Sequence, residues 1–177
     1  MPATRTQTKF TPLRAGSVYL VGGADEFTIK ETAAKLASNL APKGAGEFGV
    51  EIIEGDATNQ DEALKIIGRL REALDTVGLF GGGEKLVWLK NTNLLADTQT
   101  TRAEAVKESL LDFADTLKRG LPDGVTLLIS AIGCDRRKTA ELRGRIWTDG
   151  RACCRDVSFL DHHVDCGGPR HCPGAQR

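Results

Sequence analysis

The alternation of short apolar runs with amphipathic stretches constrains the fold of this chain more than any other feature of its sequence. Four runs are short, rich in Val, Ile and Leu, and bounded by glycine or polar residues, which is typical of buried strands. They cover residues 17–23, 49–54, 84–90 and 124–133. Buried strands separated by helices form parallel sheets with helices on both faces, so the pattern predicts an α/β fold.

Between these runs, apolar residues recur three times at the spacing of one helix face. Each stretch begins at a helix-capping signal: Asp25 for the first, Asn59 with Glu62 for the second, and "TRAE" at 101–104 for the third. Gly120 is placed to end the third helix. The three apolar stripes are Ile29, Ala33, Leu36, Ala37 and Leu40; Ala63, Ile66, Ile67, Leu70, Leu74 and Val77; and Val106, Leu110, Phe113, Ala114 and Leu117.

The composition agrees with a globular domain and argues against several classes of protein. Of the 177 residues, 40% are hydrophobic and 27% are charged, and the formal net charge is zero. A general nucleic-acid binder needs an excess of Lys and Arg, so we do not expect that role. No apolar run is long enough to span a membrane, and the N-terminus lacks the apolar region of a secretory signal. We therefore expect a cytoplasmic protein without a membrane partner.

Nucleotide binding is the first function to consider, because such sheets often hold phosphate at the turn after the first strand. That turn reads "GGADEFTIKET": Gly22 and Gly23 are present, but the second glycine and the Lys-Ser/Thr pair of a P-loop are missing. Asp25 and Glu26 stand where the phosphate would lie, and two carboxylates repel an anion. The third strand ends in "LKNTN", without the acidic pair that holds magnesium. The sequence therefore predicts a P-loop-NTPase-like architecture without a functional nucleotide site or cofactor.

Catalytic residues are not predicted within residues 16–140. Histidine is absent from this part, so neither a Ser-His nor a Cys-His pair can form there. The carboxylate pairs at 25–26 and 61–62 stand at helix starts, where we interpret them as capping and macrodipole partners. We interpret the basic cluster "CDRRK" at 134–138 as a solvated loop, with contact to an acidic partner or to a DNA phosphate as the alternative. The chain by itself is not expected to be an enzyme.

The stretch "TVGLFGGGEKLVWL" at 76–89 places a bulky apolar pair, Leu79 and Phe80, between a helical segment and three glycines. The residues alone leave two interpretations open. The pair either closes the core between helix and strand, or it is exposed for a partner and the glycines let the backbone turn it outward. The three glycines are Gly81, Gly82 and Gly83.

Four stretches together resemble the N-terminal domain of the delta subunit of bacterial DNA polymerase III, which is part of the clamp loader. They are "VYLVGGADEFTIKETAAKL", "VEIIEGDATNQDEALKII", "LFGGGEKLVWLKN" and "LPDGVTLLISAIGCDRRKTA", in the family's order and spacing from about Ser17 to Ala140. The family's domain is AAA+-like and lacks ATP-binding residues. The resemblance implies a non-catalytic clamp-loader subunit of DNA replication. The alternative is an ATP-independent AAA+-like interaction module with another partner.

The resemblance also implies a role for the apolar pair. In delta subunits, an exposed pair at this point inserts into a hydrophobic pocket of the ring-shaped sliding clamp and helps to hold the ring open. Leu79 and Phe80 would be the clamp-binding residues, and each could contribute roughly 1.5–3 kcal/mol when buried. The glycines at 81–83 would be the hinge. The implied partners are the sliding clamp, the other clamp-loader subunits and, through the complex, DNA; the whole polymerase complex is a nucleotidyltransferase.

By composition and resemblance the chain divides into three segments. We interpret residues 1–15 as a flexible lead-in, 16–140 as the AAA+-like domain, and 141–177 as an atypical tail rich in Arg, Cys, His, Gly and Pro. Members of the family continue instead into helical lid and collar domains, so we expect this chain not to join a stable loader pentamer. Our hypothesis is that the tail is read out of frame, because an off-frame reading of a GC-rich gene gives this enrichment.

A zinc site in the tail is a second interpretation. The softness of Cys and His ligands suits zinc, but adjacent HH and HC pairs do not match the usual ligand spacing, so no metal site is predicted. The residues concerned are His162, His163, Cys166, His171 and Cys172.

Overall fold

The computed structural model describes residues 18–23, 25–43, 49–76, 83–134 and 158–159. The four predicted strands and three predicted helices are confirmed within these ranges, except for the start of the third helix, and the strand bounds differ from the predicted ones by no more than two residues. The elements are β1 Val18–Gly23, α1 Glu26–Leu40, β2 Val50–Glu54, α2 Gln60–Asp75, β3 Lys85–Thr92, α3 Gln99–Arg102, α4 Glu104–Arg119, β4 Val125–Ile132 and β5 Ser158–Phe159.

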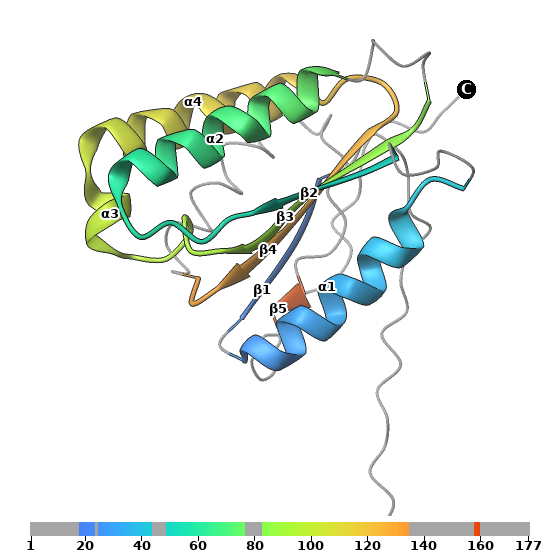
Figure 1. Cartoon of the computed structure of the whole chain (residues 1–177), viewed down its shortest axis with the longest axis horizontal. Coiled ribbons are helices and arrows are strands. Elements are labelled where there is room, and N and C mark those ends of the chain that lie inside the picture. Colours follow the sequence, from blue (N-terminus) through green and yellow to red (C-terminus); the bar gives the residue numbers. More distant parts are fainter. Residues whose placement is uncertain (1–17, 24, 44–48, 77–82, 135–157, 160–177) are drawn as a thin grey trace, which may run out of the picture.

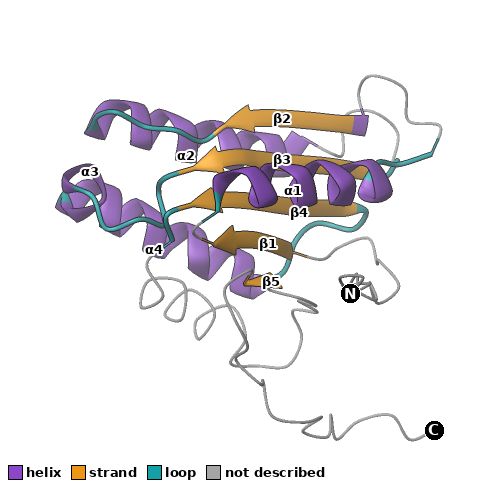
Figure 2. Ribbon diagram, turned by 90° about the horizontal axis from the view of Figure 1, so that it is seen from below, coloured by secondary structure: helices purple, strands orange, loops and turns teal. Residues whose placement is uncertain are grey.

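The strands form one parallel sheet in the order β2-β3-β4-β1-β5 (Figure 2). Helix α1 crosses one face on its way from β1 to the edge strand β2 and contacts β1, β4 and β3. Helices α2 and α4 lie side by side on the opposite face (Figure 1). The fold is therefore α/β, a parallel sheet flanked by helices of the P-loop-NTPase and AAA+ type, as predicted.

The fifth strand lies in the segment 141–177, where the sequence predicted no strand. It pairs with β1 in parallel, with Val21 opposite Ser158 and Gly22 opposite Phe159. A strand of two residues carries no periodicity, so its pairing with β1 is a tertiary feature that no local pattern reveals. The rest of this segment lies outside the described residues, and its interpretation as an out-of-frame tail stays a hypothesis.

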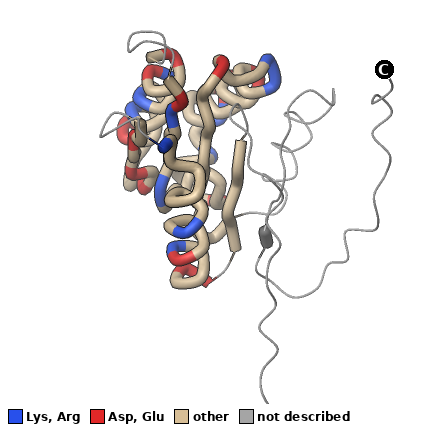
Figure 3. The backbone as a smooth tube through the Cα atoms, turned by 90° about the vertical axis from the view of Figure 1, so that its right-hand side faces the viewer, with Lys and Arg blue, Asp and Glu red and all other residues tan. Residues whose placement is uncertain are grey.

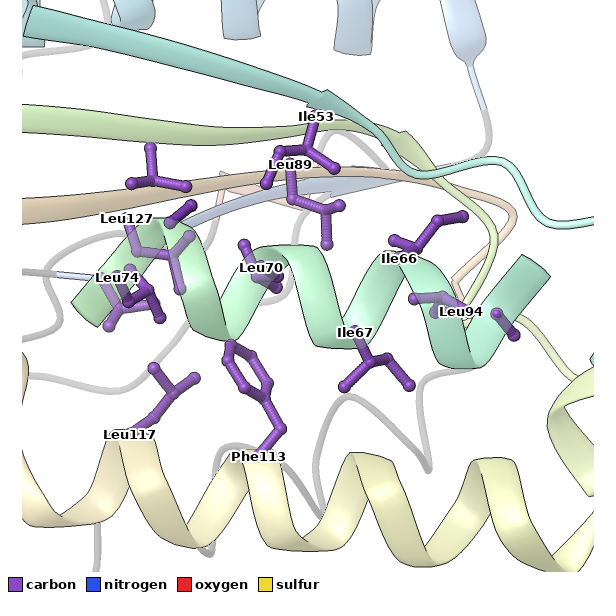
Figure 4. Close-up of a cluster of buried hydrophobic side chains, with 14 of the residues drawn as sticks. Ile53, Ile66, Ile67, Leu70, Leu74, Leu89, Leu94, Phe113, Leu117 and Leu127 are labelled. Atoms are coloured by element: carbon purple, nitrogen blue, oxygen red, sulfur yellow. The ribbon is translucent and has the colours of Figure 1, made fainter. Parts of the chain in front are cut away.

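The core forms two main layers, one on each face of the sheet. The larger cluster fills the space between the sheet and helices α2 and α4, and it includes Leu70, Phe113 and Leu127 (Figure 4). The smaller cluster lies under α1 and includes Ile29, Leu86 and Trp88. The predicted stripes face these clusters. Their buried members are Ile29, Ala33, Leu36, Ala37, Ala63, Ile66, Ile67, Leu70, Leu74, Val106, Phe113, Ala114 and Leu117.

Two members of the stripes, Leu40 and Leu110, are only partly buried, and Val77 lies outside the described residues. The predicted end of the third helix is confirmed, because Gly120 is the C-cap of α4 and has a φ of 105°. A φ in this range is strained for every residue except glycine.

The predicted start of the third helix is wrong. Thr98, not Thr101, is the capping residue, and it begins the four-residue helix α3. Thr101 is the third residue of that helix, and its hydroxyl donates to the carbonyl of Ala96 at 2.7 Å. Helix α4 then starts behind Ala103 without a side-chain cap. Thr98 and Thr101 are both good capping residues, but the two form a reciprocal capping box that starts the helix at Thr98, and this places Thr101 inside it.

Candidate functional site

The turn after β1, where a P-loop protein binds phosphate, is closely filled in the part that the structure describes. Gly22 and Gly23 are the last residues of β1, and both are buried. A Cβ added at Gly22 would lie 2.8 Å from the Sγ atom of Cys134, which follows β4. The close approach of the Cys134 side chain is thus a sufficient reason for glycine at position 22.

A carboxylate covers the N-terminus of α1. Asp25 Oδ1 accepts from the backbone N–H of Phe27 at 3.2 Å, and the other carboxylate oxygen accepts from the hydroxyl of Thr28. The bond from the Thr28 hydroxyl is the main cause that lowers the pKa of Asp25 below its usual value. Glu26 adds a second negative charge and pairs with Lys30. The chain's own carboxylate therefore takes the amide group and the helix end that a phosphate would use.

The end of β3 carries an uncharged hydrogen-bond network. Ser130 Oγ on β4 accepts from Trp88 Nε1 at 3.1 Å and from the backbone N–H of Asn91 at 3.0 Å. Asn91 has a φ of 53°, and its buried Oδ1 has no hydrogen-bond partner among the described residues. The buried hydroxyl of Thr92 donates to the carbonyl of Gly55 at 3.1 Å. Side chains that join β2, β3 and β4 thus stand where a P-loop protein places its magnesium-binding pair.

The predicted clamp-binding pair belongs to the segment between α2 and β3. Four of the five residues predicted for this site lie outside the part of the chain that the structure describes: Leu79, Phe80, Gly81 and Gly82. The fifth, Gly83, is exposed, and a Cβ there would meet no atom within 4 Å. The structure defines both ends of the segment, because α2 is followed by its C-cap Thr76 and the described chain resumes at Gly83.

One lysine at the start of β3 contacts the last turn of α2 and the neighbouring strand β2. Lys85 Nζ donates to the carbonyl of Ala73 in the last turn of α2 at 2.7 Å and lies 2.8 Å from a carboxylate oxygen of Glu51 on β2. The backbone N–H of Lys85 donates to the carbonyl of Gly124 at 2.9 Å. Its side chain is 13% exposed, which is low for a lysine. The sequence did not predict these contacts of Lys85, because an isolated lysine at the start of a strand carries no signal.

The turn between α4 and β4 lies beside Gly83 and the start of β3. Gly124 has a φ of 81°, and a Cβ there would lie 3.3 Å from the carbonyl oxygen of Gly83. In Figure 1 this turn joins α4 to β4 at the end of the sheet where β3 begins. The Pro-Asp-Gly sequence at 122–124 signals a turn, but it does not indicate which segment the turn contacts.

Charged residues of both signs are interspersed along the described helices (Figure 3). Among the described residues, no group of three or more His, Cys, Asp or Glu side chains is arranged to hold a metal ion. No helix in the described ranges is long and apolar enough to cross a membrane. The tail residues considered as zinc ligands and the basic residues 135–138 lie outside these ranges.

Comparison with known proteins gives a family for this arrangement. A family model described as DNA polymerase III, delta subunit, matches residues 19–143, which are 125 of the 177 residues. The match covers the elements from β1 to β4, and the segment between α2 and β3 with them. No curated protein and no solved structure matches the chain significantly.

Proposed function

The chain belongs to the DNA polymerase III delta subunit family, and we propose that it is a non-catalytic clamp-loader subunit that binds the sliding clamp and helps to open it. A role in the clamp loader of DNA replication follows from family membership, and direct contact with the clamp is the proposed part. The family match over residues 19–143 carries the proposal, because it includes every element around the segment 77–82.

The turn after β1 supports a role without ATP chemistry. Asp25 caps α1 with its own carboxylate, and Cys134 fills the space beside Gly22. The end of β3 offers Asn91 and Thr92 instead of the acidic side chains that orient magnesium and water. A subunit built in this way would contribute by binding a partner.

We propose that Leu79 and Phe80 bind the clamp and that the glycines at 81–83 turn them outward. The described apolar residues on either side of the segment belong to the buried core. Leu74, the last apolar residue of the stripe on α2, is 3% exposed, and Leu86 at the start of β3 is fully buried. The family match, which includes both ends of the segment, and the three glycines that follow the pair are what support a binding role.

The decisive experiment replaces both residues, Leu79→Ala with Phe80→Ala, and measures clamp affinity and thermal melting. An exposed pair that anchors the interface should cost roughly a hundredfold or more in clamp affinity, with a nearly unchanged melt. A pair that belongs to the core should instead cost roughly 2–5 kcal/mol of folding stability per residue, which lowers the melting temperature strongly.

Two single variants serve as matched controls. Phe27 is 75% exposed at the start of α1, so Phe27→Ala removes an exposed aromatic ring away from the segment and should change neither measurement. Phe113 is 5% exposed in the core under α4, so Phe113→Ala should lower the free energy of unfolding by roughly 3–5 kcal/mol. Full clamp affinity in a folded double variant would refute the site and favour an ATP-independent interaction module with another partner.

A further inference from the structure

We infer that the outer edge of β1 is a strand-docking site, and that the segment around Ser158 and Phe159 is its occupant in this chain. Docked there, β5 covers an edge that would otherwise pair with a second copy of the chain. The two strands are parallel, with Val21 opposite Ser158 and Gly22 opposite Phe159 (Figure 2). This docking site is independent of clamp binding and can be tested without the sliding clamp.

The other outer strand of the four that the sequence predicted, β2, is protected by charge. The order β2-β3-β4-β1-β5 makes β2 and β1 the outermost of those four strands. An exposed strand edge invites pairing with another chain, and proteins commonly protect it with charged side chains. On β2 the side chains of Glu51 and Glu54 are 44% and 61% exposed, and each pairs with a lysine of β3.

Strand β1 has no such protection in its own sequence. It reads VYLVGG, without a charged residue, and all six of its residues are buried. Strand β2, by contrast, exposes Ile52 to 50%. A strand that is apolar and buried throughout is typical of the interior of a parallel sheet, where a strand lies on each side. β1 therefore needs a neighbour on the side away from β4, and β5 is the strand in that position.

The chain's own sequence can supply this neighbour. The run "VSFL" at 157–160 contains β-branched and aromatic residues that favour strands, and an aspartate stands on each side of it. Four residues are too few for a prediction from sequence alone. A parallel neighbour requires a connection of a dozen or more residues, and residues 135–157 provide that length. A tethered segment meets its site at a high effective concentration, so it outcompetes the same segment of a second copy.

Proline substitutions in the full chain test the pairing, because proline has no backbone N–H. Successive residues of a strand direct their N–H groups to opposite sides, so only one of Ser158 and Phe159 donates toward β1. Ser158→Pro and Phe159→Pro should therefore differ. The substitution at the donating position should break the pairing with β1. The other should preserve it, since an edge strand tolerates proline where the N–H faces away from the sheet.

Hydrogen exchange of the backbone amides at 21–23 reports the pairing. In the variant at the donating position, the β1 amides directed toward β5 should exchange roughly tenfold faster or more than in the wild type. The β1 amides directed toward β4 should keep their protection, which shows that the rest of the sheet is intact. Ala175→Pro with Gln176→Pro is the matched control. It places prolines in the same tail away from β5 and should leave both sets of amides unchanged.

Light scattering tests whether β5 protects the edge. At roughly 0.1 mM protein, the variant at the donating position should form dimers or larger species to a greater extent than the wild type. A variant that exposes the β1 amides without any increase in association would overturn the protective role. Unchanged exchange in both single-proline variants would overturn the docking site itself.

A milder variant keeps the test decisive if the proline at the donating position prevents folding. Ser158→Gly with Phe159→Gly retains both N–H groups but weakens the strand, because glycine is unfavourable within strands. The amides of β1 directed toward β5 should then exchange roughly twofold faster or more, with the amides directed toward β4 unchanged. Equal protection in this variant and the wild type would refute the docking of the tail on β1.

Discussion

At the scale of single residues, two glycines that lie against each other, Gly83 and Gly124, differ in how well they would tolerate a side chain. Gly124 has a φ of 81°, and a Cβ on it would approach the carbonyl oxygen of Gly83 to 3.3 Å. Gly83 is exposed, and a Cβ there would meet nothing within 4 Å. The same substitution should therefore have different effects at the two positions.

We predict that Gly124→Ala lowers the free energy of unfolding by roughly 1–2 kcal/mol, because an L-residue is strained at this φ. Gly83→Ala should be neutral or should stabilise the chain by up to about 1 kcal/mol, since alanine restricts the unfolded chain. Urea unfolding of both variants measures the difference. Equal losses would contradict the assigned backbone conformations. A Gly83→Ala variant of normal stability that binds the clamp less well would support its predicted role in the hinge.

At the scale of elements, the start of α2 shows a cap that the sequence predicted and a bond that it did not. Asn59 Oδ1 accepts from the backbone N–H of Glu62 at 2.9 Å, as predicted. In a capping box, Glu62 would return the bond to Asn59. Its carboxylate instead accepts from the backbone N–H and the hydroxyl of Thr58, at 2.9 and 2.7 Å. These bonds, that from the hydroxyl first, lower the pKa of Glu62 below its usual value.

The direction of this shift predicts the pH dependence of stability. A carboxyl group whose pKa is lowered by folding stabilises the protein above its unfolded pKa, and this contribution is lost as pH falls through the folded pKa. The wild type should therefore melt above Glu62→Gln at pH 7. The difference should shrink below about pH 4, where glutamate ordinarily titrates. Asn59→Ala is the control, because its cap carries no charge and its effect should persist at low pH. A wild-type advantage that grows on acidification would refute the assignment.

At the scale of the whole molecule, the sheet has a nucleotide-binding architecture. The chain's own side chains stand where a nucleotide-binding protein would hold phosphate and magnesium. The order β2-β3-β4-β1-β5 puts the ends of β1 and β4 side by side, and this brings Cys134 against Gly22. The same arrangement joins Asn91 of β3 to Ser130 of β4. Both contacts lie at the carboxyl ends of the strands, where parallel α/β proteins bind their ligands.

We predict that the chain binds no ATP at micromolar concentrations in calorimetry, with or without magnesium. The carboxylates of Asp25 and Glu26 repel the phosphates, and the described turn offers no lysine in the position of a P-loop lysine. The opposite result is well defined: micromolar ATP affinity that is abolished by Gly23→Val would show a working phosphate site in this turn.

The sequence by itself determined the strands β1 to β4, the helices α1, α2 and α4, and the buried faces of these helices. Strand and helix periodicity depend on residues a few positions apart, and so do the caps at Asp25 and Asn59 and the C-cap at Gly120. Each of these features was predicted and is confirmed. The string of motifs also pointed to the family, which the match over residues 19–143 then showed. The binding role of Leu79 and Phe80 stays a prediction from that resemblance.

The tertiary structure decided the features that join residues distant in the chain. It added β5 to the sheet, and it placed Lys85 of β3 between Glu51 of β2 and Ala73 of α2. The physical reason is common to both. A local pattern records which side of an element is apolar and where a helix can begin, whereas a hydrogen bond or strand pairing across the fold depends on the relative positions of elements that only packing establishes.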